Sequence, residues 1–143
     1  MPLLYVEDDV AVARSVGRVL ARDVDVVVAH SVDEAKRLLD ASPGPWCCMA
    51  DLDLGPRAPR GGLDVLRIVR ARDPLAPLAV LTGHDEAEAR AAAAELSAIY
   101  IVKGSSDAAG GRARFEDGLH HFGQVAARWI RVHPPSRPLK PPS

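Results

Sequence analysis

An acidic residue, Asp51, stands at the end of a short apolar run and is the first candidate for chemistry in this sequence. The run, residues 46–50, is too short for a helix and lies between a proline and a Gly-Pro pair. It is therefore predicted to be a strand buried on both faces. In open parallel α/β sheets, ligands bind outside the carboxyl ends of the strands, so Asp51 is expected to lie in a binding crevice.

Polar residues also follow three other predicted strands: Glu7 and Asp8 follow residues 3–6, Thr82 follows residues 78–81, and Lys103 follows residues 98–102. Each of these residues alone has an ordinary explanation as a helix cap, a turn residue or a surface charge. In a parallel sheet, however, all these strand ends lie at the same edge. The combination therefore predicts one polar site.

Three carboxylates within a few ångströms repel one another and raise one another's pKa unless a cation lies among them. All-oxygen ligands with room for water suit Mg²⁺. With the metal, Lys103 and the Thr82 hydroxyl around it, the site fits the three anionic oxygens of a phosphoryl group. Asp51 is then the predicted nucleophile, forming an acyl phosphate.

Predicted strands and helices alternate along the chain and would hold these residues in place. Strands are expected at residues 3–6, 24–29, 46–50, 78–81 and 98–102, and helices at residues 12–20, 31–39, 63–72, 85–96 and 112–133. Asp9, the Ser31/Glu34 pair and the Asp85/Glu88 pair are expected to cap three of the helices. The pattern predicts a doubly wound α/β fold with helices on both faces and the flavodoxin-like strand order 2-1-3-4-5. That order places Glu7 and Asp8 beside Asp51.

Four segments, V-E-D-D, M-A-D-L-D-L, L-T-G and Y-I-V-K, resemble the receiver domain of bacterial two-component response regulators. The resemblance covers residues 3–103. It implies the following roles: Asp51 as the phosphoacceptor, Asp8 as a direct Mg²⁺ ligand, Glu7 as a ligand through water, the Asp53 carbonyl as a further ligand, Thr82 and Lys103 as phosphoryl-binding residues, and Tyr100 as the aromatic switch.

The same resemblance implies a phosphorelay protein rather than an enzyme, apart from catalysis of its own phosphorylation and dephosphorylation. The phosphoryl donor is expected to be a histidine kinase or a histidine phosphotransfer protein. The output is expected to pass through contact with a downstream protein. Asp53 and His84 lie two residues beyond Asp51 and Thr82, from where they are hypothesised to tune the lifetime of the acyl phosphate.

Two features depart from the family pattern. Gly104 replaces the usual proline after Lys103, and the loop of residues 55–62 is longer than usual and carries Arg57 and Arg60. We interpret that loop as a solvated surface loop in preference to one that selects the kinase or contacts the phosphoryl group. The departures leave open a degenerate receiver that binds partners without phosphate. A phosphatase of the haloacid dehalogenase type is a further alternative, because D-L-D-L resembles its nucleophile motif.

The length of 143 residues predicts one domain. The net charge of −1 argues against electrostatic binding of nucleic acid. Residues 1–133 are expected to form the receiver with an extended last helix, and residues 134–143 a disordered, proline-rich tail. A soluble, cytoplasmic protein is expected because the sequence shows no secretion signal and no membrane-spanning run.

Cys47 and Cys48 are expected to be core residues on opposite faces of a strand. Trp129 and Ile130 are expected to cover the domain itself or, slightly preferred, a partner or a second copy in a homodimer.

Overall fold

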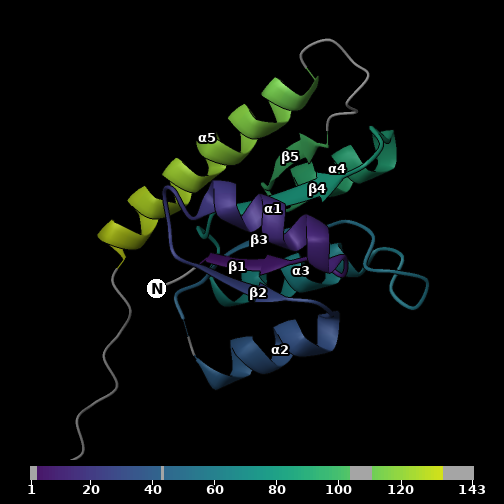
Figure 1. Cartoon of the computed structure of the whole chain (residues 1–143). Helices are drawn as coiled ribbons and strands as arrows, with labels where there is room; N and C mark the ends of the chain where they lie inside the picture. The colour runs from purple at the N-terminus through teal and green to yellow at the C-terminus, as the bar shows by residue number, and fades with distance from the viewer. Residues whose placement is uncertain (1–2, 43, 104–110, 134–143) are drawn as a thin grey trace, which may run out of the picture.

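The structure is a computed structural model that describes residues 3–42, 44–103 and 111–133. Strands and helices alternate along the chain (Figure 1). The elements are β1 (Leu3–Val6), α1 (Val10–Leu20), β2 (Val26–Ala29), α2 (Val32–Ala41), β3 (Cys47–Asp51), α3 (Gly61–Arg72), β4 (Leu78–Thr82), α4 (Ala87–Glu95), β5 (Ile99–Val102) and α5 (Gly111–Val132). Every predicted element is present, and no boundary differs from the prediction by more than two residues.

The five strands form one parallel sheet in the order β2-β1-β3-β4-β5. Helices α1 and α5 cover one face, and α2, α3 and α4 cover the other (Figure 1). The predicted doubly wound, flavodoxin-like fold is confirmed. The topological switch point lies between β1 and β3, whose carboxyl ends therefore flank a natural binding crevice.

The apolar residues of the central strand β3 do not alternate with polar residues, because both faces of the strand are buried. Cys47 packs in the core on the α1 and α5 side, whereas Cys48 packs in the core on the opposite side. Both are free thiols and completely buried. A parallel strand covered on both faces needs apolar side chains at every position, so the predicted role of these cysteines as core residues is confirmed.

The helix starts follow the predicted capping chemistry in two of three cases. The Asp9 carboxylate accepts hydrogen bonds from the N–H groups of the next helix at 2.9 and 3.1 Å. Ser31 accepts one from the Glu34 N–H at 3.1 Å, although Glu34 reaches back to the preceding residue rather than to Ser31 itself. The Asp85/Glu88 prediction was wrong. Helix α4 begins at Ala87 without a side-chain cap, because the Asp85 carboxylate pairs with Arg90 instead.

The last helix packs its apolar stripe against the domain itself. Leu119, Phe122 and Ala126 are buried, and Trp129 and Ile130 lie partly buried against the same core. The slightly preferred alternative, in which Trp129 and Ile130 contact a partner, stays a prediction, because the domain covers these two side chains only in part. A homodimer through this helix stays a prediction. Gly104 and residues 134–143 lie outside the described residues.

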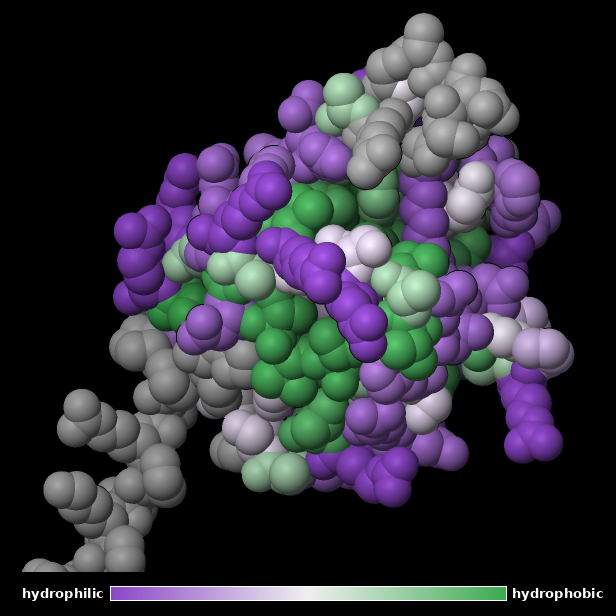
Figure 2. All heavy atoms as spheres, viewed as in Figure 1, coloured by the Kyte–Doolittle hydropathy of each residue, from purple (hydrophilic) through white to green (hydrophobic). Residues whose placement is uncertain are grey.

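Figure 2 shows apolar side chains gathered over the edge strand β2, with hydrophilic side chains around them. The valines of this strand are only partly buried because β2 has a neighbour on one side alone. Its four residues offer a short edge, which limits pairing with another chain. In the described part of the chain, no helix is both long and apolar enough to cross a membrane.

Candidate functional site

A cavity of about 500 Å³ lies at the carboxyl ends of the strands, at the switch point of the sheet. The carboxylates that line it belong to Glu7, Asp8, Asp9, Asp51, Asp53 and Glu86, and the lysine and arginine that line it are Lys103 and Arg60. Thr82 and His84 line the same cavity. Of the residues predicted to form the site, only Tyr100 lies outside this lining, and it borders the adjacent pocket instead.

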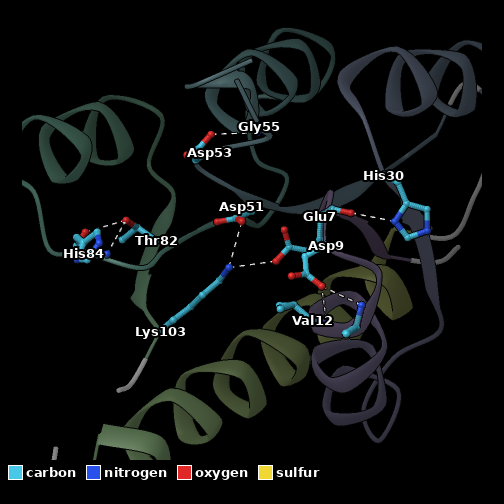
Figure 3. A network of polar contacts seen from close by, with 11 residues as sticks. Glu7, Asp9, Val12, His30, Asp51, Asp53, Gly55, Thr82, His84 and Lys103 are labelled. Carbon is cyan, nitrogen blue, oxygen red and sulfur yellow. Dashed lines mark hydrogen bonds and ion pairs between the residues drawn. The ribbon is translucent and has the colours of Figure 1, made fainter. Parts of the chain in front are cut away.

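The ammonium group of Lys103 lies between two carboxylates that line the cavity (Figure 3). Its Nζ is 3.0 Å from Oε1 of Glu7 and 3.1 Å from Oδ2 of Asp51. Burial lowers the pKa of Lys103, but the two carboxylates outweigh burial, so this pKa lies above its ordinary value. Lys103 is therefore a fixed positive charge beside Asp51.

Glu7 is the most deeply buried charged side chain of the site, with 1% of its surface exposed. Its pKa is raised from 4.5 to about 8, first by burial and then by the neighbouring Asp51 carboxylate, whereas Lys103 acts in the opposite direction. Its second oxygen, Oε2, is buried and has no hydrogen-bond partner among the described residues. Such an oxygen is a free ligand atom.

The acidic cluster fits a divalent cation. One oxygen each from Glu7, Asp8 and Asp51 lies within 4.8 Å of the other two. Carboxylate oxygens are the ligands that Mg²⁺ prefers, and the cavity leaves room for the waters that this ion retains. Together with the unpaired Oε2 of Glu7, these observations support a Mg²⁺ site in this acidic pocket.

Thr82 is buried at the end of β4, but its hydroxyl is engaged with the following loop. Its Oγ1 donates to the His84 carbonyl at 2.7 Å and accepts from the His84 N–H at 3.3 Å (Figure 3). To bind a phosphoryl oxygen on Asp51, the hydroxyl would have to give up the carbonyl. The exposed His84 side chain borders the cavity.

Tyr100 also holds the loop that follows β4. Its hydroxyl accepts a hydrogen bond from the Glu86 N–H at 3.0 Å, and the guanidinium of Arg90 lies 4.5 Å from the centre of its ring. Asp85 holds Arg90 in turn at 2.9 Å. The aromatic side chain therefore ties β5 to the start of α4.

The loop after β3 contributes both an acid and a close backbone contact. The Asp53 side chain is exposed, and its Oδ1 accepts from the Gly55 N–H at 3.0 Å. Helix α3 begins at Gly61, two residues before the predicted start. A Cβ on Gly62 would lie only 1.9 Å from the Asp51 carbonyl oxygen, so only glycine lets this helix approach the site.

Sequence reasoning missed three other residues of the site. Glu86 lines the cavity, although no local sequence pattern indicates it. Gly62 lies in helix α3, although the sequence predicts a loop there because glycine disfavours helices. His30 donates from Nδ1 to the Glu7 carbonyl at 2.9 Å and so joins the ends of β1 and β2. The Gly-Gly pair was the one sequence signal available, since paired glycines often mark close backbone contacts.

The raised pKa of Glu7 predicts how stability depends on pH. In the unfolded chain this carboxyl loses its proton near pH 4.5, whereas in the folded chain it does so near pH 8. Between these values the native state binds more protons, so the free energy of unfolding should fall by a few kcal/mol as pH rises across the window. Urea unfolding at several pH values measures this loss, which saturating Mg²⁺ should offset because metal binding needs the ionised carboxylates.

The control for this prediction is Glu7→Gln, which cannot titrate. Its stability should depend on pH less steeply than that of the wild-type protein between pH 4.5 and 8. An equal slope in the two proteins would assign the pH dependence to other groups and contradict the prediction.

The protein is an α/β domain with an acidic pocket at the switch point of a parallel sheet. Residues 3–110 match the family model of the response regulator receiver domain. The chain therefore belongs to the response regulator receiver domain family, and its pocket of Glu7, Asp8 and Asp51 is consistent with a phosphoacceptor site. This family is normally non-enzymatic apart from autophosphorylation chemistry, and membership implies a cognate kinase in general terms.

Solved structures share this fold at low sequence identity. A response regulator receiver domain protein from Clostridium thermocellum is 19% identical, with a TM-score of 0.69, and the match covers 92% of this chain and 97% of that one. The chemotaxis protein CheY4 of Vibrio cholerae is 18% identical, with a TM-score of 0.66 and coverage of 87% and 96%. The receiver domain of the Francisella response regulator 1452 is 19% identical, with a TM-score of 0.66 and coverage of 91% and 99%. A search of curated proteins found no match.

Proposed function

We propose that this protein is a phosphorylation-controlled signalling module that accepts a phosphoryl group on Asp51. The observation that carries the proposal is the position of Lys103, whose Nζ lies within 3.1 Å of both Asp51 and Glu7, in a cavity that Asp8 also lines. A carboxylate beside a fixed cation and a metal-binding acidic pair has the groups that phosphoryl transfer requires. A histidine kinase or histidine phosphotransfer protein is the proposed donor.

In the proposed reaction an Asp51 carboxylate oxygen attacks the phosphorus atom of the donor. An O–P bond forms, the P–N bond of the phosphohistidine breaks, and the electron pair of that bond leaves with the imidazole nitrogen, which takes up a proton. Lys103 neutralises one phosphoryl oxygen, and Thr82 would bind another after releasing the His84 carbonyl. When bound by Glu7, Asp8, Asp51 and the Asp53 carbonyl, Mg²⁺ would supply charge neutralisation of the oxygens.

The proposed output is a shift between two arrangements of the loop that joins β4 to α4. Movement of the Thr82 hydroxyl toward the phosphoryl group would free the His84 carbonyl and with it the Tyr100 contact to Glu86. A downstream protein, or a second copy through α5, would then distinguish the two arrangements. The cytoplasmic location stays a prediction.

The two alternative functions that the sequence suggests, a phosphatase and a receiver that works without phosphate, are not equally supported. The phosphatase alternative requires the D-L-D-L segment on the first strand, whereas the structure has it at the end of β3, and the acidic pair directly follows β1. Membership of the receiver family excludes that assignment. A receiver that works without phosphate remains the second candidate, and the completeness of the acidic pocket favours phosphorylation over it.

The proposal is tested by incubating the protein with acetyl phosphate, with and without Mg²⁺, and measuring its intact mass. A phosphorylated fraction that requires Mg²⁺ and is removed by hydroxylamine, which cleaves acyl phosphates, would support an aspartyl phosphate. Transfer from a phosphorylated histidine phosphotransfer protein would support the proposed donor. A folded protein that stays unmodified under all these conditions would favour the second candidate.

The lifetime of the acyl phosphate supplies a further prediction. His84 is exposed, borders the cavity and lies two residues beyond Thr82, so its side chain can position or activate an attacking water. We expect His84→Ala to change the rate of autodephosphorylation several-fold, or about 1 kcal/mol in the barrier. The decay of phosphorylated protein after removal of the donor measures it, with His121→Ala, on the exposed side of α5, as the control. Equal decay in the wild type and both variants would contradict the role of His84.

A further inference from the structure

Arg60 lies at the mouth of the cavity, immediately before helix α3. Its guanidinium Nη2 is 3.4 Å from Oε2 of Glu86 and 3.6 Å from Oε2 of Glu88. Glu86 precedes helix α4 and Glu88 lies in its first turn, so the contact joins the starts of two helices across the mouth. The Arg60 side chain is 45% exposed and therefore free to change partners.

The start of α3 holds Arg60 close to the phosphoacceptor. Gly62, two residues further on, donates its N–H to the Leu52 carbonyl at 3.2 Å and lies directly against the Asp51 backbone. This contact fixes the backbone from which the Arg60 side chain extends. The Arg60 backbone is also held by the helix, since its carbonyl accepts a hydrogen bond from the Leu63 N–H at 3.1 Å.

The charges around the cavity give Arg60 a role once a phosphoryl group is present. Among the described residues that line the cavity, Arg60 is the one arginine or lysine besides Lys103, which already contacts Glu7 and Asp51. A phosphoryl group adds negative charge and three acceptor oxygens at this point. A guanidinium binds such oxygens through two parallel hydrogen bonds, whereas exposed ion pairs with carboxylates contribute little.

We propose that Arg60 is a further binding residue for the phosphoryl group on Asp51, and that it exchanges Glu86 and Glu88 for that group. This inference rests on the proposed function. The exchange releases the start of α4 from α3, at the same point where the Glu86 N–H is held by Tyr100. Arg60 therefore couples occupation of the site to the loop whose two arrangements form the proposed output.

The test measures the affinity for beryllofluoride, a phosphoryl mimic, in the presence of Mg²⁺ at low salt. Amide NMR is the suitable readout because Trp46 precedes β3 and Trp129 lies late in α5, both away from the site. We expect Arg60→Gln to bind about tenfold more weakly, the effect of one charge-assisted hydrogen bond at a partly exposed site. The control is Arg57→Gln, in the same loop; Arg57 is exposed and is not among the described residues that line the cavity, so its affinity should be unchanged.

A second pair of variants separates binding of the phosphoryl group from positioning of α4. The double variant Glu86→Gln, Glu88→Gln frees Arg60 and should bind beryllofluoride about threefold more tightly, as expected when a weak competing ion pair is removed. Arg60→Lys keeps the charge without the planar pair of donors and should give an intermediate affinity.

Two results would overturn this inference but leave the proposed function intact. Equal affinities in Arg60→Gln and Arg57→Gln would show that Arg60 does not bind the group, and weaker binding in the Glu86, Glu88 double variant would show that the ion pair merely positions α4. If the folded wild-type protein does not bind beryllofluoride with Mg²⁺, the proposed function fails, and this inference fails with it.

Discussion

Replacing Asp51 with asparagine is expected to abolish phosphorylation. The side chain of Asp51 is 11% exposed, opens into the cavity and lies 3.1 Å from Lys103, so its carboxylate is the nucleophile that the site presents to a donor. An asparagine has nearly the same shape but is a far weaker nucleophile and carries no charge for Mg²⁺. Intact-mass measurement after acetyl phosphate treatment should therefore show no phosphorylated fraction.

The matched control is Asp53→Asn, the same chemical change two residues along the chain. The Asp53 side chain is exposed and bonded to the Gly55 N–H, and only its backbone carbonyl is proposed to contact the metal. Asp53→Asn should therefore still be phosphorylated, with an altered rate of decay as its main effect. Phosphorylation of Asp51→Asn at the wild-type level would refute the assignment of the phosphoacceptor.

Asp51→Asn should leave the fold intact. The change removes one of two neighbouring carboxylates, and Lys103 keeps its contact with Glu7. We expect the free energy of unfolding to stay within about 1 kcal/mol of the wild-type value. Urea unfolding measures it, and this result separates loss of chemistry from loss of structure.

Replacing Gly62 with alanine is expected to cause the largest loss of stability among these single variants. The new Cβ would lie 1.9 Å from the Asp51 carbonyl oxygen and 2.7 Å from its carbonyl carbon. Both are backbone atoms of a central strand and cannot rotate away, so helix α3 must move as a whole. We expect the free energy of unfolding to fall by about 3 kcal/mol, with weaker Mg²⁺ binding because Asp51 is displaced.

Gly17→Ala is the matched control, since Gly17 also lies within a helix but a Cβ added there would meet nothing within 4 Å. At this position, alanine should raise the free energy of unfolding by about 0.5–1 kcal/mol through helix propensity alone. Urea unfolding of both variants compares the same chemical change in two environments. Stability of Gly62→Ala at or above the wild-type level would contradict the close contact between α3 and β3.

The fold could be predicted from the amino-acid sequence because the patterns that specify it are local and periodic. Continuous apolar runs such as residues 46–50 must be covered on both faces. Strands that alternate with helices form a parallel sheet, for which only a few topologies are possible. Once the strand order is set, the polar residues at the strand ends must lie together. Glu7, Asp8, Asp51, Thr82 and Lys103 could therefore be predicted to line one cavity, as they do.

The contacts that these side chains make could not be predicted from the sequence. Lys103 lies 96 residues from Glu7 in the chain, and no sequence pattern shows that its ammonium contacts Glu7 as well as Asp51. The same holds for Arg60 with Glu86, and for the Thr82 hydroxyl, which bonds to the His84 carbonyl. Hydrogen bonds and ion pairs act over a few ångströms and depend on side-chain rotamers, so they are settled only when packing has brought distant segments together.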